Sequence, residues 1–277
     1  MKHWWMLGLL ALAMVACKRE GAPAPTAPVT PGATAATTAP AGAPAPVELK
    51  DVSESTPDYM VGISYQVQAG KYPGLDAELR KYADNARADL VEAAKARQQP
   101  GGQTPAPYDL PFSLTELMDT PTVVALAADG SSYTGGAHGS PLIARFVWLP
   151  EQGRLLRASD LIADAQGWSA VSAYVREQLH AALSQRVDAD DLTPTERADV
   201  VKNSSRMIDE GTEPDPADFA LFEPMASPQG GKLAGLRFVF APYQVGPYSD
   251  GTQTVEVPAD VLLPHVAPAY RSLFVGG

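Results

Sequence analysis

Apolar and polar side chains follow two different periods along the chain, and each period predicts one kind of secondary structure. The stretch YMVGISYQVQ, which starts at Tyr59, alternates apolar and polar residues, as a half-buried strand does. The next stretch repeats apolar residues at three- and four-residue spacing, which predicts one face of a helix. That face consists of Leu75, Leu79, Tyr82, Ala83, Ala86 and Leu90. The Pro/Gly-rich run QQPGGQTPAP then predicts a loop.

Farther along, strand patterns and helix patterns occur in separate groups. Strand patterns are found at 108–119, 121–136, 141–149, 219–225, 232–245 and 252–258. Helical patterns are found at 168–183, after the capping box from Thr193 to Glu196, and at 258–266. Because strands and helices come in runs and do not alternate strictly, the sequence predicts an α+β fold. We expect antiparallel strands packed with helices in one compact two-part unit.

The N-terminal end has the pattern of a secretion signal. MKHWWMLGLLALAMVAC places Lys2 before an apolar run from Trp4 to Val15, and small residues lead to Cys17. Such a run is too short to cross a bilayer and is typical of a signal peptide. We therefore predict a lipoprotein signal peptide at residues 1–16.

The residues before the cysteine resemble a bacterial lipobox, with Met14 where leucine is usual. The resemblance implies that Cys17 is acylated, and several acyl chains would hold the protein on a membrane. The alternative is ordinary cleavage that leaves Cys17 as a free thiol, which an oxidising compartment disfavours. Lys18, in place of an aspartate, resembles lipoproteins sorted to the outer membrane. We expect a lipid-anchored outer-membrane protein, facing the periplasm or exposed at the cell surface.

Residues 17–46 are nearly all Ala, Pro, Thr and Gly after the first few positions, and they contain nothing large enough to form a core. The sequence predicts a disordered Ala/Pro/Thr-rich linker here. The formal net charge is −11, and loss of Lys2 with the signal makes it −11 − 1 = −12. A negative surface disfavours nucleic acid and favours cationic partners, although solubility alone is an alternative explanation.

Three segments together resemble a known family. They are YTGGAHG at 133–139, FVW followed by GRLLRASDLI, and LRFVFAPYQVGPYSDGTQTVEVPADVL. They resemble the paired domains of unknown function in RsiV-type anti-sigma factors and before the deacetylase of PdaC-type peptidoglycan enzymes. The resemblance covers roughly residues 47–266 and implies a PdaC-like half at 47–150 and an RsiV-like half at 151–277.

This resemblance also implies an α+β unit that, in RsiV, receives lysozyme. The chain departs from that plan, because we find neither a sigma-binding segment nor a catalytic domain in it. We therefore expect a binding role and not the signalling role. Lysozyme is strongly cationic, so attraction to an acidic chain has the right sign. The resemblance does not identify which residues contact a ligand.

The stretch SSYTGGAHG, residues 131–139, has two interpretations. As a catalytic base, His138 needs a nucleophile or substrate within reach and a partner that fixes its tautomer. The chain has no Gly-x-Ser-x-Gly, Ser-x-x-Lys or His-Glu-x-x-His motif to support that role. As a corner, Gly135 and Gly136 allow a positive backbone angle or a close approach of strands, while the imidazole hydrogen-bonds the turn.

We predict that the protein is not an enzyme and has no catalytic residue or cofactor. Its histidines lack zinc-like spacing, so we also predict no metal site. The candidate ligand-binding residues are His138, Tyr133, Tyr243, Tyr248 and Asp250. The expected function is an envelope lipoprotein that binds a cell-wall or protein ligand, either peptidoglycan or a cationic lysozyme-like protein. Its other expected partner is the membrane, through acylated Cys17, and not nucleic acid. The alternative is a cell-wall-active hydrolase or accessory domain that uses His138.

Overall fold

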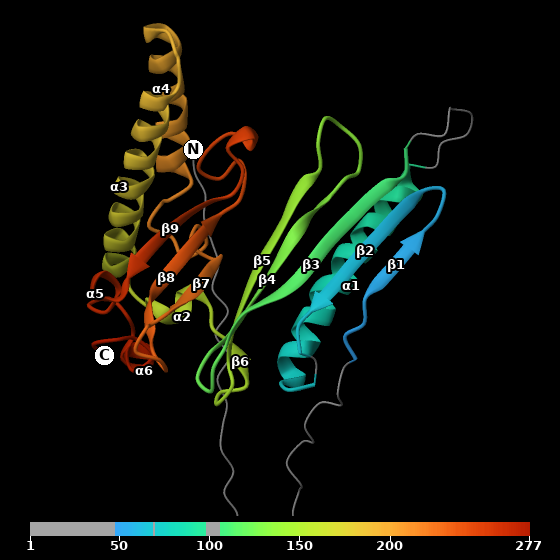
Figure 1. The fold of residues 1–277 in the computed structure, drawn as a ribbon, viewed down its shortest axis with the longest axis horizontal. Helices are drawn as coiled ribbons and strands as arrows, with labels where there is room; N and C mark the ends of the chain where they lie inside the picture. The colour runs from blue at the N-terminus through green and yellow to red at the C-terminus, as the bar shows by residue number, and fades with distance from the viewer. Residues whose placement is uncertain (1–47, 69, 98–105) are drawn as a thin grey trace, which may run out of the picture. The chain divides into compact units, whose positions relative to one another are not determined.

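The computed structural model describes residues 48–68, 70–97 and 106–277, all of which fall in one compact unit of the chain (Figure 1). The predicted signal peptide, the predicted linker and Cys17 lie outside these residues. Helices pack against two sheets whose strand pairs are antiparallel with one exception. The predicted α+β fold is therefore confirmed. The division of the chain at residue 150 remains a prediction.

The first sheet has six strands in the spatial order β1-β2-β3-β4-β5-β6. They are β1 (Val52–Ser55), β2 (Tyr59–Gln66), β3 (Tyr108–Asp119), β4 (Val124–Ser132), β5 (Ser140–Leu149) and β6 (Arg154–Leu155). Strands β2 and β3 are parallel, and this is the exception to the antiparallel pairing. A parallel pair needs a long crossover connection, which helix α1 (Pro73–Ala96) supplies. The sequence analysis did not identify β1.

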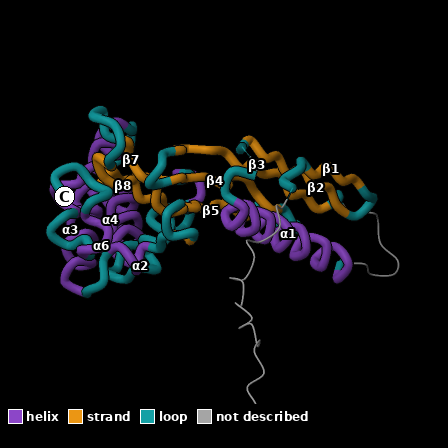
Figure 2. Tube along the Cα trace, turned by 90° about the horizontal axis from the view of Figure 1, so that it is seen from below, coloured by secondary structure: helices purple, strands orange, loops and turns teal. Residues whose placement is uncertain are grey.

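Helix α1 lies along the six-stranded sheet (Figure 2). Its buried side includes Leu75, Leu79 and Leu90, as the three- and four-residue spacing predicted. These side chains share one core cluster with alternate residues of the neighbouring strands, among them Ile63 of β2 and Leu114 of β3. Because each fully buried aliphatic side chain contributes about 1.5–3 kcal/mol, this contact between helix and strands stabilises the first half of the described chain.

The second sheet has three antiparallel strands in the order β7-β8-β9. They are β7 (Phe222–Ala226), β8 (Leu233–Phe240) and β9 (Gln253–Pro258). The accompanying helices are α2 (Ala158–Leu161), α3 (Ala165–Ala189), α4 (Pro194–Glu210), η1 (Tyr248–Asp250), α5 (Ala259–Leu262) and α6 (Pro268–Arg271). Helix α3 contacts both α4 and β9. The second sheet is therefore packed against helices, as the first one is.

Aromatic side chains fill the core beside the second sheet. Phe219 is fully buried and lies 5.2 Å from Phe238 and 5.4 Å from Trp168, measured between ring centres. The indole nitrogen of Trp168 donates to the carbonyl of Ile162 at 2.9 Å, so its polar atom is satisfied in the core. The predicted face of the 168–183 helix points into this core. These contacts fix α3 against the sheet.

The predicted capping box at the start of α4 is confirmed. The Thr193 hydroxyl accepts from the backbone amide of Glu196 at 3.3 Å, and the Glu196 carboxylate accepts from the amide of Thr193 at 2.9 Å. Pro194 occupies the first helical turn, where its missing amide hydrogen has no cost. The cap therefore defines where α4 begins.

A buried ion-pair network, which we call the ionic junction, links the two sheets. Arg145 on β5 donates through Nε to Glu223 on β7 at 2.7 Å, and its Nη1 lies 2.9 Å from Asp129 on β4. Arg237 on β8 also donates to Glu223, at 3.2 Å. The Arg145 and Glu223 side chains are only 8% and 12% exposed. Asp129 and Arg237 are 54% and 41% exposed, so the Arg145–Glu223 pair is the buried centre of the junction, and removing either of its partners would be costly.

Candidate functional site

Two loops from different sheets meet in a cluster of aromatic side chains, which we call the aromatic loop site. The loop between β4 and β5, residues 133–139, begins at Tyr133 and contributes His138 to the cluster, and the loop between β8 and β9, residues 241–252, contributes Tyr243 and Tyr248. The hydroxyl of Tyr243 lies 2.9 Å from Nε2 of His138, although the two residues are 105 positions apart. Tertiary structure thus joins candidates that the sequence analysis selected separately.

The first loop is shaped by a tyrosine and two glycines. Tyr133 exchanges backbone hydrogen bonds with Asp109 at 2.7 and 3.0 Å, and its hydroxyl donates to the carbonyl of Gly136 at 3.1 Å. Gly135 and Gly136 have φ values of 99° and 101°, which L side chains rarely adopt. The positive angles predicted by the corner interpretation are therefore confirmed. Tyr133 closes this corner and does not join the contacts around His138.

The second loop displays an exposed tyrosine from an anchored base. The amide of Gln244 donates from its side chain to the carbonyls of Gly211 at 3.0 Å and Asp218 at 2.8 Å, while Val245 is buried. Tyr243, next to this anchor, is 54% exposed and has a φ of 75°. Among the residues that the structure describes, Tyr243 is the only non-glycine residue with a positive φ. Such strain persists only where surrounding contacts impose it, and it is enriched at functional sites.

His138 is held by three contacts. Its ring stacks on Tyr248 with centres 3.8 Å apart and an interplanar angle of 15°. Its Nδ1 lies 3.2 Å from the carbonyl of Gly139, which also accepts from the hydroxyl of Tyr248 at 3.3 Å. Because a carbonyl oxygen only accepts, Nδ1 is the donor, and Nε2 of the neutral ring accepts from Tyr243. Both nitrogens of the exposed imidazole are therefore engaged within the site.

This arrangement offers a ligand aromatic faces with polar edges. Tyrosine combines a large apolar ring with a hydroxyl, and such side chains are enriched at binding surfaces. A general base, in contrast, needs an Nε2 that can reach a substrate proton, and here Tyr243 occupies that position. The geometry is suited to recognition more directly than to proton transfer.

Asp250 lies apart from these ring contacts. It ends the short helix η1, and its Oδ2 is 2.7 Å from Nη1 of Arg186 on α3. That contact is ionic and not a well-aligned hydrogen bond, because Oδ2 has no hydrogen-bond partner among the described residues. Its side chain is 14% exposed. Asp250 therefore tethers the second loop to α3, and sequence reasoning missed Arg186 because 64 residues separate it from Asp250.

Among residues 48–68, 70–97 and 106–277, no group of three or more His, Cys, Asp or Glu side chains comes together in a way that could hold a metal ion. Among the same residues, no helix combines the length and apolar character that crossing a bilayer requires.

Residues 159–260 match the sequence model of a family described as protein of unknown function (DUF3298). The predicted domain of unknown function is confirmed over this DUF3298 segment. It contains Tyr243, Tyr248 and Asp250, whereas Tyr133 and His138 precede it. The aromatic loop site is thus built partly from the DUF3298 segment and partly from the sheet before it.

Two solved structures are similar to the chain at 15% sequence identity and a TM-score of 0.49. One is a DUF3298 family member from Bacteroides fragilis, with 82% of this chain and 96% of that chain covered. The other is a DUF3298 family protein from Pseudomonas aeruginosa PAO1, with 81% and 95% covered. No curated protein matches the chain significantly.

Proposed function

We propose that this protein is a non-enzymatic envelope lipoprotein of the RsiV-like kind, and that its aromatic loop site binds a cationic, lysozyme-like protein. The observation that carries the proposal is Tyr243, which is exposed, has a positive φ and is held in place by His138. A rigid aromatic side chain presented in advance loses little entropy when a partner covers it. Energetic hot spots of protein interfaces are enriched in such tyrosines.

Charge supports the choice of partner. The formal net charge of −11 attracts a cationic protein over distances longer than a contact. This attraction raises the association rate, while the aromatic contacts determine how long the complex lasts. Peptidoglycan is the other ligand expected from the sequence, but it has no comparable positive charge to exploit this field.

The test is a titration of the 47–277 fragment, which contains every described strand and helix, with lysozyme. We expect saturable binding that weakens as salt rises, because screening shortens the range of the attraction. Tyr243→Ala should weaken binding by about 30-fold, the equivalent of a hot spot of about 2 kcal/mol. The matched control is Met60→Ala, which truncates another exposed side chain, on β2, and should leave binding unchanged.

Two further arms separate the alternatives. Sedimentation with purified peptidoglycan in place of lysozyme would redirect the proposal to a cell-wall ligand. Murein cleavage that disappears in a folded His138→Ala variant would overturn the non-enzymatic assignment. If His138 instead only joins the two loops, the His138→Ala variant should have a lower thermal stability, and the parent protein should show no murein cleavage.

The anchor is proposed from the sequence and is tested separately. Cys17 should carry acyl chains, and the protein should fractionate with the outer membrane. Mass spectrometry of the purified protein would identify the modification, and a Cys17→Ser variant should be released from the membrane. An unmodified Cys17 in a freely soluble product would contradict this part of the proposal.

A further inference from the structure

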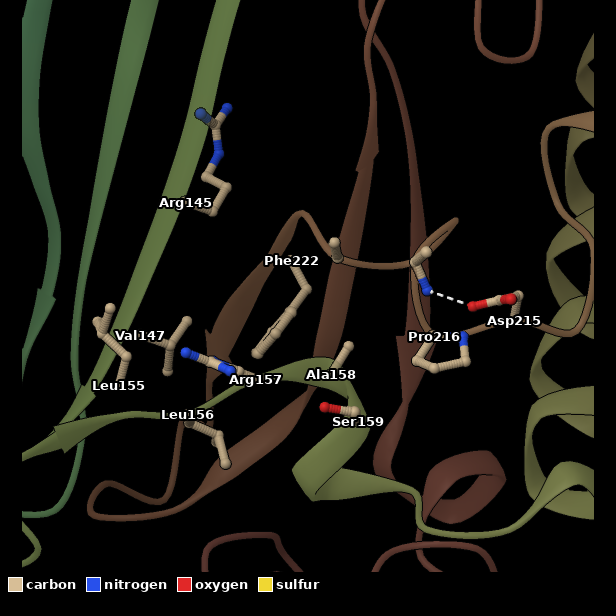
Figure 3. Close-up of a pocket in the computed structure, with 12 residues that line it drawn as sticks. Arg145, Val147, Leu155, Leu156, Arg157, Ala158, Ser159, Asp215, Pro216 and Phe222 are labelled. Atoms are coloured by element: carbon tan, nitrogen blue, oxygen red, sulfur yellow. Dashed lines mark hydrogen bonds between the residues drawn. The ribbon is translucent and has the colours of Figure 1, made fainter. Parts of the chain in front are cut away.

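An open groove of about 350 Å³ lies beside the ionic junction (Figure 3). It is lined by none of the residues of the aromatic loop site. Its apolar surface comes from Val147 on β5, Leu156, Pro216 and Phe222 at the start of β7. Segments of the chain on both sides of the DUF3298 boundary at residue 159 therefore form it together.

One positive charge at this groove forms no ion pair among the described residues. Arg145 also lines the groove, but Glu223 and Asp129 already neutralise it. Arg157 is exposed, and no carboxylate of the described residues lies within ion-pair distance of its guanidinium. The neighbouring Asp160 directs Oδ2 to Arg154 and to the backbone amide of Arg157. The guanidinium of Arg157 thus keeps its donors for another anion.

The far wall carries the opposite charge. Asp215 accepts from the backbone amide of Ala217 at 2.8 Å through Oδ1, the bond drawn in the close-up (Figure 3). It has no ion pair within the described ranges. Figure 3 shows Arg157 and Asp215 on either side of Phe222 and Pro216. A cation and a carboxylate therefore flank an apolar floor.

We propose that this groove binds the carboxyl-terminal end of a short peptide. The free carboxylate pairs with Arg157, the last apolar side chain covers Phe222 and Val147, and a preceding backbone N–H faces Asp215. The volume is near the lower limit for small-ligand sites, which suits two or three residues. The inference concerns a different site from the aromatic loop site and does not rest on the proposed function.

Other anions fit less well. A long alkyl carboxylate shares the charge, but it has no amide N–H to donate to Asp215 on the far wall. A phosphate or another polyanion would be repelled by Asp215. A peptide end is the chemistry that matches both walls and the floor, because it combines a carboxylate, an apolar side chain and amide donors.

The experiment is a calorimetric titration of the purified full chain with tripeptides that end in Ala, Leu or Phe, each as the free acid and as the amide. We expect at least one acid to bind saturably. Its amide should bind at least about tenfold more weakly, because a charge-assisted contact is lost. Arg157→Gln should remove the preference for the acid. Arg206→Gln removes the same charge from an exposed pair on α4 and should bind like the unchanged protein.

Further arms keep the proposal open to failure. Ala220→Trp places a bulky side chain at the groove from an exposed position and should abolish binding while the melting temperature stays near that of the parent. Tyr243→Ala should bind the peptides normally, which distinguishes this site from the aromatic loop site. The proposal is overturned if no tripeptide binds, if acid and amide bind equally, if Arg157→Gln keeps the preference, or if decanoate binds more tightly than every peptide.

Discussion

The ionic junction and the aromatic loop site both connect the first sheet to the second, but they differ in burial. Arg145 and Glu223 are 8% and 12% exposed, whereas Tyr243 is 54% exposed. At the junction, little solvent reaches the contact between Arg145 and Glu223 to replace a lost partner. At the loop site, water or a ligand can take over any contact. The ionic junction therefore stabilises the fold, whereas the contacts of the aromatic loop site can be replaced when a partner binds.

The ionic junction and the aromatic loop site also differ in the kind of contact that each one makes. Glu223 receives both Arg145 and Arg237, so its removal takes the nearest buried counter-ion from Arg145, while Arg237, 41% exposed, keeps Glu256. His138, in contrast, is held by one side-chain hydrogen bond and by stacking. Such exposed contacts contribute about 0.5–1.5 kcal/mol each, so a partner can rearrange them without unfolding the protein.

The largest expected effect comes from breaking the junction. Glu223→Gln keeps the shape of the side chain but removes the negative charge between Arg145 and Arg237. We expect a loss of about 3 kcal/mol in the free energy of unfolding, measured by urea denaturation, because the buried Arg145 then keeps only the largely exposed Asp129 as its counter-ion.

The control for this change is Glu210→Gln on α4. Its partner is Arg206, and both side chains are 62% exposed. The expected change is within about 0.5 kcal/mol, as for other exposed pairs. Equal midpoints for Glu223→Gln and the parent protein would refute the structural role of the junction.

A smaller effect is expected from relieving strain at the loop site. Because Tyr243 has a φ of 75°, glycine is the residue that adopts this backbone angle without cost. Tyr243→Gly should be more stable than Tyr243→Ala by about 1 kcal/mol in thermal or urea unfolding. Both variants lose the hydrogen bond to His138, so their difference isolates the backbone. If alanine is tolerated as well as glycine, the loop is not strained.

A still smaller effect, although larger than that of the exposed control pair on α4, is expected at a partly exposed pair in the first half of the described chain. Arg87 on α1 binds both carboxylate oxygens of Glu54 on β1, at 2.6 and 2.8 Å, with side chains 40% and 29% exposed. Glu54→Gln should cost about 0.5–1 kcal/mol at neutral pH. This pair is thus the intermediate case between the buried junction and a fully solvated contact.

The same pair makes a pH prediction. Hydrogen bonding to Arg87 lowers the pKa of Glu54 below its ordinary value of 4.5. Its stabilisation is therefore fully present above that value and is lost as the pH falls through the lowered pKa of the folded state. Urea unfolding from pH 7 to acid should show the parent and Glu54→Gln converging. A constant difference down to the lowest pH would contradict the ionic origin of the effect.

Much of the secondary structure was accessible from periodicity. The spacing of Leu75, Leu79 and Leu90 predicted α1, and the cap at Thr193 predicted the start of α4. Strand β1 was missed because four residues are too few to establish a period. The parallel pairing of β2 and β3 was missed because alternation along a strand does not say which way its neighbour runs.

The candidate site was partly accessible too. His138 attracted attention beside Gly135 and Gly136, and Tyr243 and Tyr248 did so beside prolines, but nothing local indicated that they touch. Arg157 offered no signal in the sequence, because only the surrounding contacts reveal that it forms no ion pair within the described part of the chain. Nothing in the sequence indicated either that Glu223 would pair with Arg145 at the ionic junction.

The sequence by itself determined which segments become helices and strands, where the caps and glycine corners lie, and the acidic character of the chain. These properties depend on side chains within a few positions of one another. Only the tertiary structure decided that His138 meets Tyr243, that Asp250 meets Arg186 and that Arg145 is buried with Glu223. Such contacts join residues 64 to 105 positions apart, and they form because the packing of two sheets and their helices fixes where distant side chains lie.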